Sequence, residues 1–153
     1  HKRMWSLFAS VGVFDKKLNN KIQSFKTPED WTPVFVKEIY EDLARHKAYA
    51  TGLGRCTQPD ARALPDIVFR ESREVTLKEI ALVNPEIVIA FGNQVASNLL
   101  GIPIKVSENR RKKYLLPIGR KKFPVYATYY PVGMGLRNIG KAIEDIKHVL
   151  KNC

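Results

Sequence analysis

The chain has 153 residues, the length of one domain with an ordinary apolar core, so we expect residues 1–153 to form a single domain. A charged fraction of 27% and a hydrophobic fraction of 44% are typical of globular proteins. No apolar run approaches the ~18 residues that a membrane span needs, and no secretory signal is recognisable, so we expect no membrane partner. With two cysteines that form no disulfide framework, a cytoplasmic location is the default, and we expect a monomer.

The net charge of +11 and the pI of about 9.8 have two explanations. Lysine enrichment serves solubility or heat tolerance in many proteins. Alternatively, the chain binds a polyanion, because Lys and Arg release counterions from phosphates. Basic residues cluster in NRRKKY (109–114) and GRKKF (119–123), which modestly favours nucleic acid.

The cysteines and histidines indicate neither a metal nor a cofactor. Cys56 and Cys153 form no disulfide framework and no C-x-x-C pair. The three histidines, His1, His46 and His148, lack the spacing of metal ligands.

The first expected element is a helix that ends at Gly12. Its apolar stripe comprises Met4, Leu7, Phe8 and Val11. The polar stretch 15–30 is predicted to be irregular. A second helix begins after Thr32 as a cap, with Pro33 in its first turn. Its predicted inward face comprises Val36, Ile39, Tyr40 and Leu43.

The middle of the chain is predicted to contain a short strand, AYATGL (48–53), and a long loop (54–66) interrupted by prolines. A third helix is predicted over 68–83. Its expected inward residues are Leu77, Ile80 and Ala81.

The stretch NPEIVIAFGNQVASNLLG (84–101) is the clearest unit of the sequence. Residues 87–91 form a continuous apolar run, which is typical of a strand covered on both faces. Gly92 permits a tight turn, Asn93 can cap the following helix, and Gly101 ends it. The apolar residues of that helix are Val95, Ala96, Leu99 and Leu100.

A basic, hairpin-like region, a strand over 125–129 and a last helix complete the chain. The apolar stripe of that helix comprises Ile139, Ala142, Ile143, Ile146, Val149 and Leu150. Strands that alternate with helices predict an α/β fold, a three-layer sandwich with a small, mainly parallel central sheet. Ligands of such sheets bind outside the carboxyl ends of the strands, so the candidate site comprises 52–55, 92–93 and 129–135.

Three stretches carry a resemblance to a known family. YATGLGRCTQPDAR, NPEIVIAFGNQVASNLLG and VYATYYPVGMGLRN occur in the order found in the uracil-DNA glycosylase superfamily. From about Tyr49 to its end the chain resembles the bacterial and archaeal iron–sulfur branch, and RMWSLFASVGV more weakly resembles the family's first helix. The resemblance implies that family's fold, a DNA partner (single- or double-stranded), and hydrolysis of the N-glycosidic bond of an extruded uracil or other deaminated base.

The resemblance also implies roles for the loop after the last strand. Tyr130 stands where the family has a histidine that donates to the base oxygen, and a tyrosine hydroxyl can also donate. The loop from Tyr130 through Pro131 would enter the minor groove, with Met134 and Leu136 as wedges and Arg137 near a phosphate. The alternative is an ordinary strand-to-helix loop whose apolar side chains fold onto the core.

The sequence departs from the family pattern in three places. Gly52 replaces the asparagine that reads the uracil edge, so base selection is expected to differ. Cys56 matches one cluster ligand, but the next expected position is Ser72, so we expect no iron–sulfur cluster. The family's first strand and its catalytic turn would precede residue 1, and the chain begins at His1, so we expect a segment upstream.

Other residues have both a functional and a structural interpretation. Asn93 could contact phosphate or base, although an N-cap role is commoner. Asp60 could hold water, although loop aspartates usually accept from backbone donors. Arg110, Arg111 and Lys112 could follow a DNA backbone or form a solvated hairpin tip.

Three functions remain open on the sequence. The first is a metal-free DNA glycosylase with Tyr130 as its donor. The second is a catalytically inactive nucleic-acid-binding relative, favoured by Gly52, Tyr130 and the missing front motif. The third is an α/β nucleotide-binding enzyme unrelated to DNA.

Overall fold

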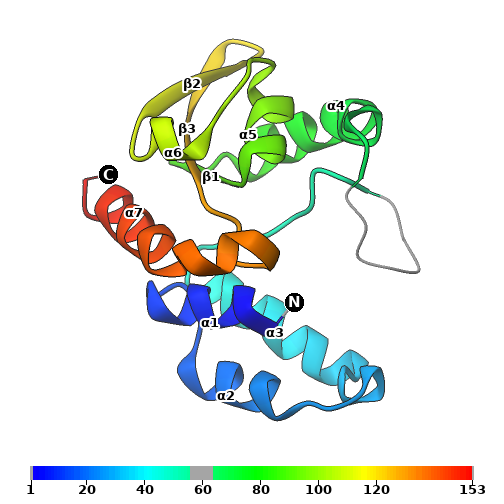
Figure 1. The fold of residues 1–153 in the computed structure, drawn as a ribbon. Helices are drawn as coiled ribbons and strands as arrows, with labels where there is room; N and C mark the ends of the chain where they lie inside the picture. The colour runs from blue at the N-terminus through cyan, green and yellow to red at the C-terminus, as the bar shows by residue number, and fades with distance from the viewer. Residues whose placement is uncertain (1, 56–63, 153) are drawn as a thin grey trace.

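The structure is a computed structural model that describes residues 2–55 and 64–152, and its fold is α/β with one small sheet (Figure 1). Its helices are α1 Lys2–Ser10, α2 Lys16–Ser24, α3 Pro33–Arg45, α4 Asp66–Val83, α5 Asn93–Leu100, α6 Val106–Asn109 and α7 Ile139–Lys151, with 3-10 segments η1 Pro28–Asp30 and η2 Gly133–Asn138. Its strands are β1 Val88–Phe91, β2 Lys113–Ile118 and β3 Lys121–Thr128. None of the helices in these ranges is both long and apolar enough to cross a membrane.

The sheet has the order β1-β3-β2 and is mixed. β1 pairs with β3 in parallel, with Val88 opposite Val125, and β2 pairs with β3 antiparallel, with Leu116 opposite Phe123. The α/β prediction is confirmed, but the prediction of a mainly parallel sheet is wrong. The predicted strand 48–53 is absent from the sheet, and the basic region supplies β2 instead, folded back on β3 at Gly119, whose φ is 59°.

Helices pack on both faces of the sheet, in agreement with the predicted layers (Figure 1). On one face, Phe69 and Ile80 of α4 and Leu99 of α5 join Val125 and Ala127 of β3 in the main core. On the other face, Leu7 of α1 and Ala142 and Ile146 of α7 pack against Ile89, Phe91 and Tyr129.

The first three helices form a separate apolar cluster (Figure 1). Its buried residues are Ala9, Phe14, Ile22, Phe35, Ile39 and Leu43. The prediction that residues 15–30 are irregular is wrong, because α2 and η1 lie there. Asp15 caps α2 by accepting from the backbone N–H groups of Lys17 and Leu18, at 2.7 and 2.9 Å.

Two predicted helices have the expected extent but a different inward face. Thr32 caps α3 as predicted, at 3.2 Å from Phe35 N, but Tyr40 is 64% exposed and Asp42 is buried instead. In α4, Ala81 is exposed, whereas Ile80 is buried as expected.

The predicted strand 48–53 is not present, because that segment has no regular structure. Its side chains do not alternate between core and solvent: only Leu53 is buried. Thr51 instead donates to Glu79 of α4 at 3.2 Å, and Arg55 pairs with the same carboxylate. The segment is therefore hydrogen-bonded to α4, and Leu53 packs in the main core, but the segment adds no strand to the sheet.

The unit 84–101 has the predicted form. β1 runs from Val88 to Phe91, and α5 ends at Gly101, whose φ of 72° gives the expected left-handed cap. The last helix is also confirmed over Ile139–Lys151, and it begins directly after η2.

Candidate nucleic-acid interface

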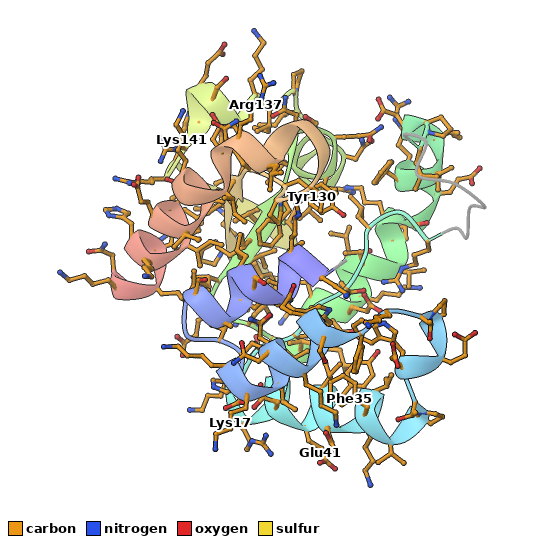
Figure 2. All side chains as sticks on the ribbon, turned by 60° about the horizontal axis from the view of Figure 1, so that its bottom comes forward. Lys17, Phe35, Glu41, Tyr130, Arg137 and Lys141 are labelled. Atoms are coloured by element: carbon orange, nitrogen blue, oxygen red, sulfur yellow. The ribbon has the colours of Figure 1, made fainter. Side chains whose placement is uncertain are left out.

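The loop after β3 is anchored at both ends and exposed in between. Tyr129 packs partly buried against the sheet clusters, and Pro131 is fully buried. Between them Tyr130 is 44% exposed, and Arg137 further along is exposed. Figure 2 shows Tyr130, Arg137 and Lys141 around the η2–α7 segment. The loop therefore presents an aromatic and a basic side chain from a fixed backbone.

Two glycines allow that backbone to pack closely. A Cβ at Gly135 would lie 1.8 Å from the carbonyl oxygen of Tyr130, so no larger residue fits without moving the chain. Gly92 has a φ of 90°, its N–H donates to Thr128 O at 2.8 Å, and a Cβ there would lie 3.4 Å from Tyr130 Cβ. The carboxyl ends of β1 and β3 are thus adjacent, as predicted.

The predicted segment around Gly52 does not join them. It is not a strand end, and a Cβ at Gly52 would have only Gly54 O, at 3.5 Å, within 4 Å. The expectation of three strand ends at one site is therefore wrong. Cys56 and Asp60 lie outside the described residues.

Arg110 and Arg111 contact a buried carboxylate. Asp145 of α7 is 2% exposed, and it accepts from Arg110 Nε at 3.0 Å, Arg110 Nη2 at 2.9 Å and Arg111 Nε at 3.0 Å. Thr128 Oγ1 donates to the same group at 3.1 Å. The pKa of the Arg110 guanidinium is raised, mainly because it donates hydrogen bonds to Asp145. Partial burial acts in the opposite direction. The prediction of a solvated hairpin tip is wrong for both arginines, because they lie between α6 and β2, away from the turn, and connect that segment to α7.

Lys112, by contrast, is exposed, with its ammonium 5.2 Å from the centre of the Tyr114 ring. A role of Lys112 at phosphate stays a prediction. Leu136 is half-buried in η2, and the side chain of Met134 lies outside the described part, so the wedge assignment also stays a prediction.

Asn93 has a role that sequence reasoning missed. Its Oδ1 accepts from the backbone N–H of Val106 at 2.9 Å, which fixes the connection between α5 and α6. The N-cap position belongs to Gly92, so the expected capping role is wrong.

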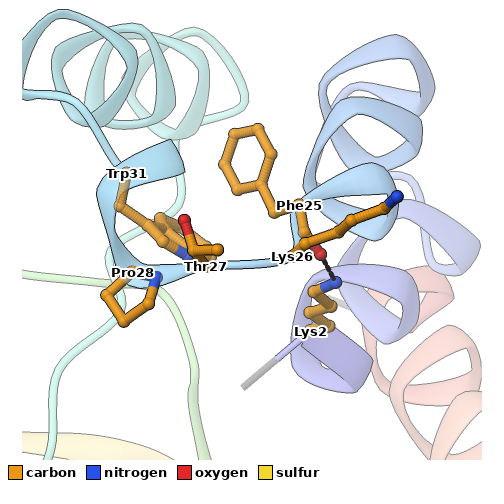
Figure 3. Close-up of a pocket in the computed structure, with 6 residues that line it drawn as sticks. All are labelled: Lys2, Phe25, Lys26, Thr27, Pro28 and Trp31. Atoms are coloured by element: carbon orange, nitrogen blue, oxygen red, sulfur yellow. Dashed lines mark hydrogen bonds between the residues drawn. The ribbon is translucent and has the colours of Figure 1, made fainter.

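Two hollows on the described surface are lined by other elements. One, of about 440 Å³, lies between α1 and η1 and is lined by Lys2, Phe25, Lys26, Thr27, Pro28 and Trp31 (Figure 3). The other, of about 650 Å³, lies between α4 and α5 and is lined by residues that include Asp66, Arg70 and Arg73. The described residues also contain no group of three or more His, Cys, Asp or Glu side chains placed to hold a metal.

The arrangement offers exposed hydrogen-bond donors and an aromatic ring at two parallel strand ends, a place where α/β sheets bind ligands. No family model matches the sequence, and no solved structure matches the fold.

Proposed function

We propose that this domain binds DNA at the carboxyl ends of β1 and β3, as a divergent relative of the uracil-DNA glycosylase superfamily. The observation that carries the proposal is the construction of the Tyr130–Arg137 loop. Buried Pro131 and tightly packed Gly135 hold it, while Tyr130 and Arg137 face outward. Exposed aromatic and arginine side chains on a fixed loop suit contact with bases and phosphates.

The charge distribution supports a polyanionic ligand. Residues 105–122 contain eight of the 26 Lys and Arg residues and one of the 15 Asp and Glu residues. Arg110 and Arg111 are engaged by Asp145, but the exposed lysines of the hairpin still give that side of the molecule a positive potential. Of these lysines, Lys113 lies nearest the loop, because it is paired with Tyr126, whereas Lys121 and Lys122 lie at the far end of β3, beside the turn.

The test is fluorescence anisotropy with a labelled 20-base-pair duplex at several salt concentrations. Arg137→Gln is expected to weaken binding and to reduce the slope of log affinity against log salt by about 0.9, the value for one lost phosphate contact. Lys17→Gln on α2 is the matched control, because Figure 2 shows Lys17 away from η2. Duplex binding that is absent or insensitive to salt would reject the proposal.

The second candidate is excision of a deaminated base, and the state of Tyr130 favours it. Within the described part of the chain, no hydrogen bond involves the Tyr130 hydroxyl, which leaves it able to donate to a base oxygen. In that reaction the bond between the sugar C1′ and the base nitrogen breaks and its electron pair leaves with the base. Water then adds hydroxide to C1′ and a proton to the base, while Tyr130 would stabilise the negative charge.

A single-turnover assay separates the two candidates. Oligonucleotides with uracil, hypoxanthine or xanthine are incubated with the protein and treated with alkali to reveal abasic sites. Strand breaks whose rate falls about 10²-fold or more in Tyr130→Phe would support excision. Salt-sensitive binding without strand breaks from any of the three bases would leave DNA binding alone.

A further inference from the structure

One face of the β2–β3 hairpin is uncovered. Alternate residues of β2, namely Tyr114, Leu116 and Ile118, face the main core together with Phe123 and Val125 of β3. The opposite face carries three cross-strand pairs, which we call the open hairpin face: Lys113–Tyr126, Leu115–Pro124 and Pro117–Lys122. Of these residues Leu115 is 53% exposed and the lysines and Pro117 are exposed as well, whereas Pro124 and Tyr126 are partly buried.

The helices that cover this side of the sheet, α1 and α7, lie over β1 and the carboxyl end of β3, not over the hairpin turn. α1 and α7 pack on Ile89, Phe91 and Tyr129, and Asp145 of α7 meets Thr128 at the end of β3. Figure 1 shows the hairpin extending beyond α7. Tyr126, two residues before Thr128, therefore lies where the covered part of the face ends.

The charge at this face is positive. Lys113 and Lys122 lie at its two ends on opposite strands, and Arg120 at the turn is exposed nearby in the sequence. The acidic groups of α7 next to the hairpin are compensated: Asp145 pairs with both arginines, and Glu144 lies 3.5 and 3.6 Å from their guanidinium nitrogens. A polyanion would thus meet little repulsion from α7.

We propose that the open hairpin face binds single-stranded nucleic acid, with Tyr126 stacking on a base and Lys113 and Lys122 contacting phosphates. An aromatic ring on an exposed sheet face, flanked by basic side chains, is a general means of holding unpaired bases. Residues two apart on a strand lie about 7 Å apart, so a strand of bases can extend across Leu115 and Pro124. This inference rests on the proposed binding of nucleic acid and names the form of the ligand at a second place on the domain.

A nucleic acid fits this face better than a protein partner. The one large aliphatic side chain on it is Leu115, and the centres of protein interfaces are depleted in lysine because its ammonium is costly to desolvate. Backbone phosphates, in contrast, gain from lysines at both ends.

The test uses fluorescein-labelled (dT)12 and a 12-base-pair duplex, each measured by anisotropy from about 50 to 200 mM salt. Tyr126→Ala is expected to weaken (dT)12 binding about tenfold, the scale of one lost stacked base, while Tyr126→Phe keeps it. The double variant Lys113→Gln with Lys122→Gln is expected to lower the salt slope by about 1.4, or 0.7 for each phosphate of a single strand. The duplex, bound by the loop, is expected to be affected much less by Tyr126→Ala.

Matched controls are Tyr40→Ala, at another exposed tyrosine on α3, and Lys16→Gln with Lys78→Gln, which removes the same charge elsewhere. Circular dichroism shows whether each variant is folded. The inference would be overturned if the control and test variants lost the same amount of affinity for (dT)12, or if Tyr126→Ala bound (dT)12 unchanged. Association of the protein with itself through this face would also overturn it. If neither (dT)12 nor the duplex bound, the proposed function would be rejected as well. If the duplex bound normally and (dT)12 did not bind, only this inference would be rejected.

Discussion

The basic segment 110–122, which includes the residues just before β2 and the turn of the hairpin, contains two kinds of positive charge that look alike in the sequence. Arg110 and Arg111 turn inward to Asp145, and their side chains are 27% and 41% exposed. Lys113 and Lys122, a few residues away, remain exposed on the open hairpin face. A run of basic residues therefore does not report on ligand binding until the positions of the acidic residues are known.

The difference follows from the chemistry of the two side chains. A guanidinium has several donors in a fixed plane, so Arg110 can give Asp145 two hydrogen bonds at once. An ammonium on a flexible stem is more strongly hydrated and gains less from a buried partner. The arginines contribute to the fold, and the lysines are available to a ligand.

Removal of the buried charge should have the largest effect. Asp145→Asn would leave two arginines without their carboxylate, and loss of one member of a buried pair costs about 3–5 kcal/mol. Because both arginines are partly exposed, we expect a loss near 3 kcal/mol. Urea unfolding followed by circular dichroism measures it, provided that the denaturant slope is unchanged.

Glu144→Gln is the control for that variant, because Glu144 contacts the same arginines but is 65% exposed. Exposed ion pairs contribute about 0–1 kcal/mol, so a small change is expected. Equal losses in the two variants would show that burial does not distinguish these carboxylates.

A smaller loss is expected at the loop that carries Tyr130. Gly135→Ala places a Cβ against the Tyr130 carbonyl, and overpacking of this kind costs about 1–3 kcal/mol. At Gly140 on α7 a new Cβ would meet nothing within 4 Å, so Gly140→Ala should be neutral or slightly stabilising. The measurement is the midpoint of thermal unfolding of each variant. Equal midpoints in Gly135→Ala and Gly140→Ala would contradict the role of Gly135.

Secondary structure could be predicted from the sequence where local signals and tertiary packing agree. The unit 84–101 has an apolar run, a glycine turn, a periodic stripe and a glycine cap, and β1 and α5 follow it closely. The short helix α2 was missed because its only apolar residues, Leu18 and Ile22, give a weak stripe in a polar stretch. Its capping residue, Asp15, was the available signal.

The candidate site was harder to predict, since its partners are distant in the sequence. Asp145 lies between the inward residues Ala142 and Ile146 of α7, and a carboxylate on an apolar stripe signals a buried ion pair. Which arginines it binds, 34 and 35 residues earlier, depends on the hairpin. The open hairpin face likewise depends on the β2–β3 register, and Tyr126 has no local feature that separates it from a core tyrosine.

Asp15, the carboxylate that caps α2, is expected to make the stability of the protein depend on pH. The pKa of Asp15 is lowered, chiefly because the Leu18 N–H donates to it, with Lys17 N–H as a further donor. The contribution of Asp15 to the stability of the folded state is therefore fully present above the unfolded pKa of about 3.9. It is lost as the pH falls through the lower pKa of Asp15 in the folded state. Asp15→Asn keeps the cap without the charge, so its melting temperature should fall less than that of the unaltered protein between pH 5 and 3. An identical fall in both proteins would contradict this assignment.

The smallest effect on stability is expected from the lysines, and that result would complete the contrast with the arginines. Lys113→Gln with Lys122→Gln should change the free energy of unfolding by no more than about 0.5 kcal/mol, because neither side chain is buried. Arg111→Gln, with the same loss of charge, should cost more because it removes a hydrogen bond to buried Asp145. If the lysine variant unfolds as early as the arginine variant, these lysines support the hairpin and their effect on nucleic-acid binding cannot be separated from folding. If it unfolds like the unaltered protein but loses (dT)12, the open hairpin face has a binding role that the fold itself does not require.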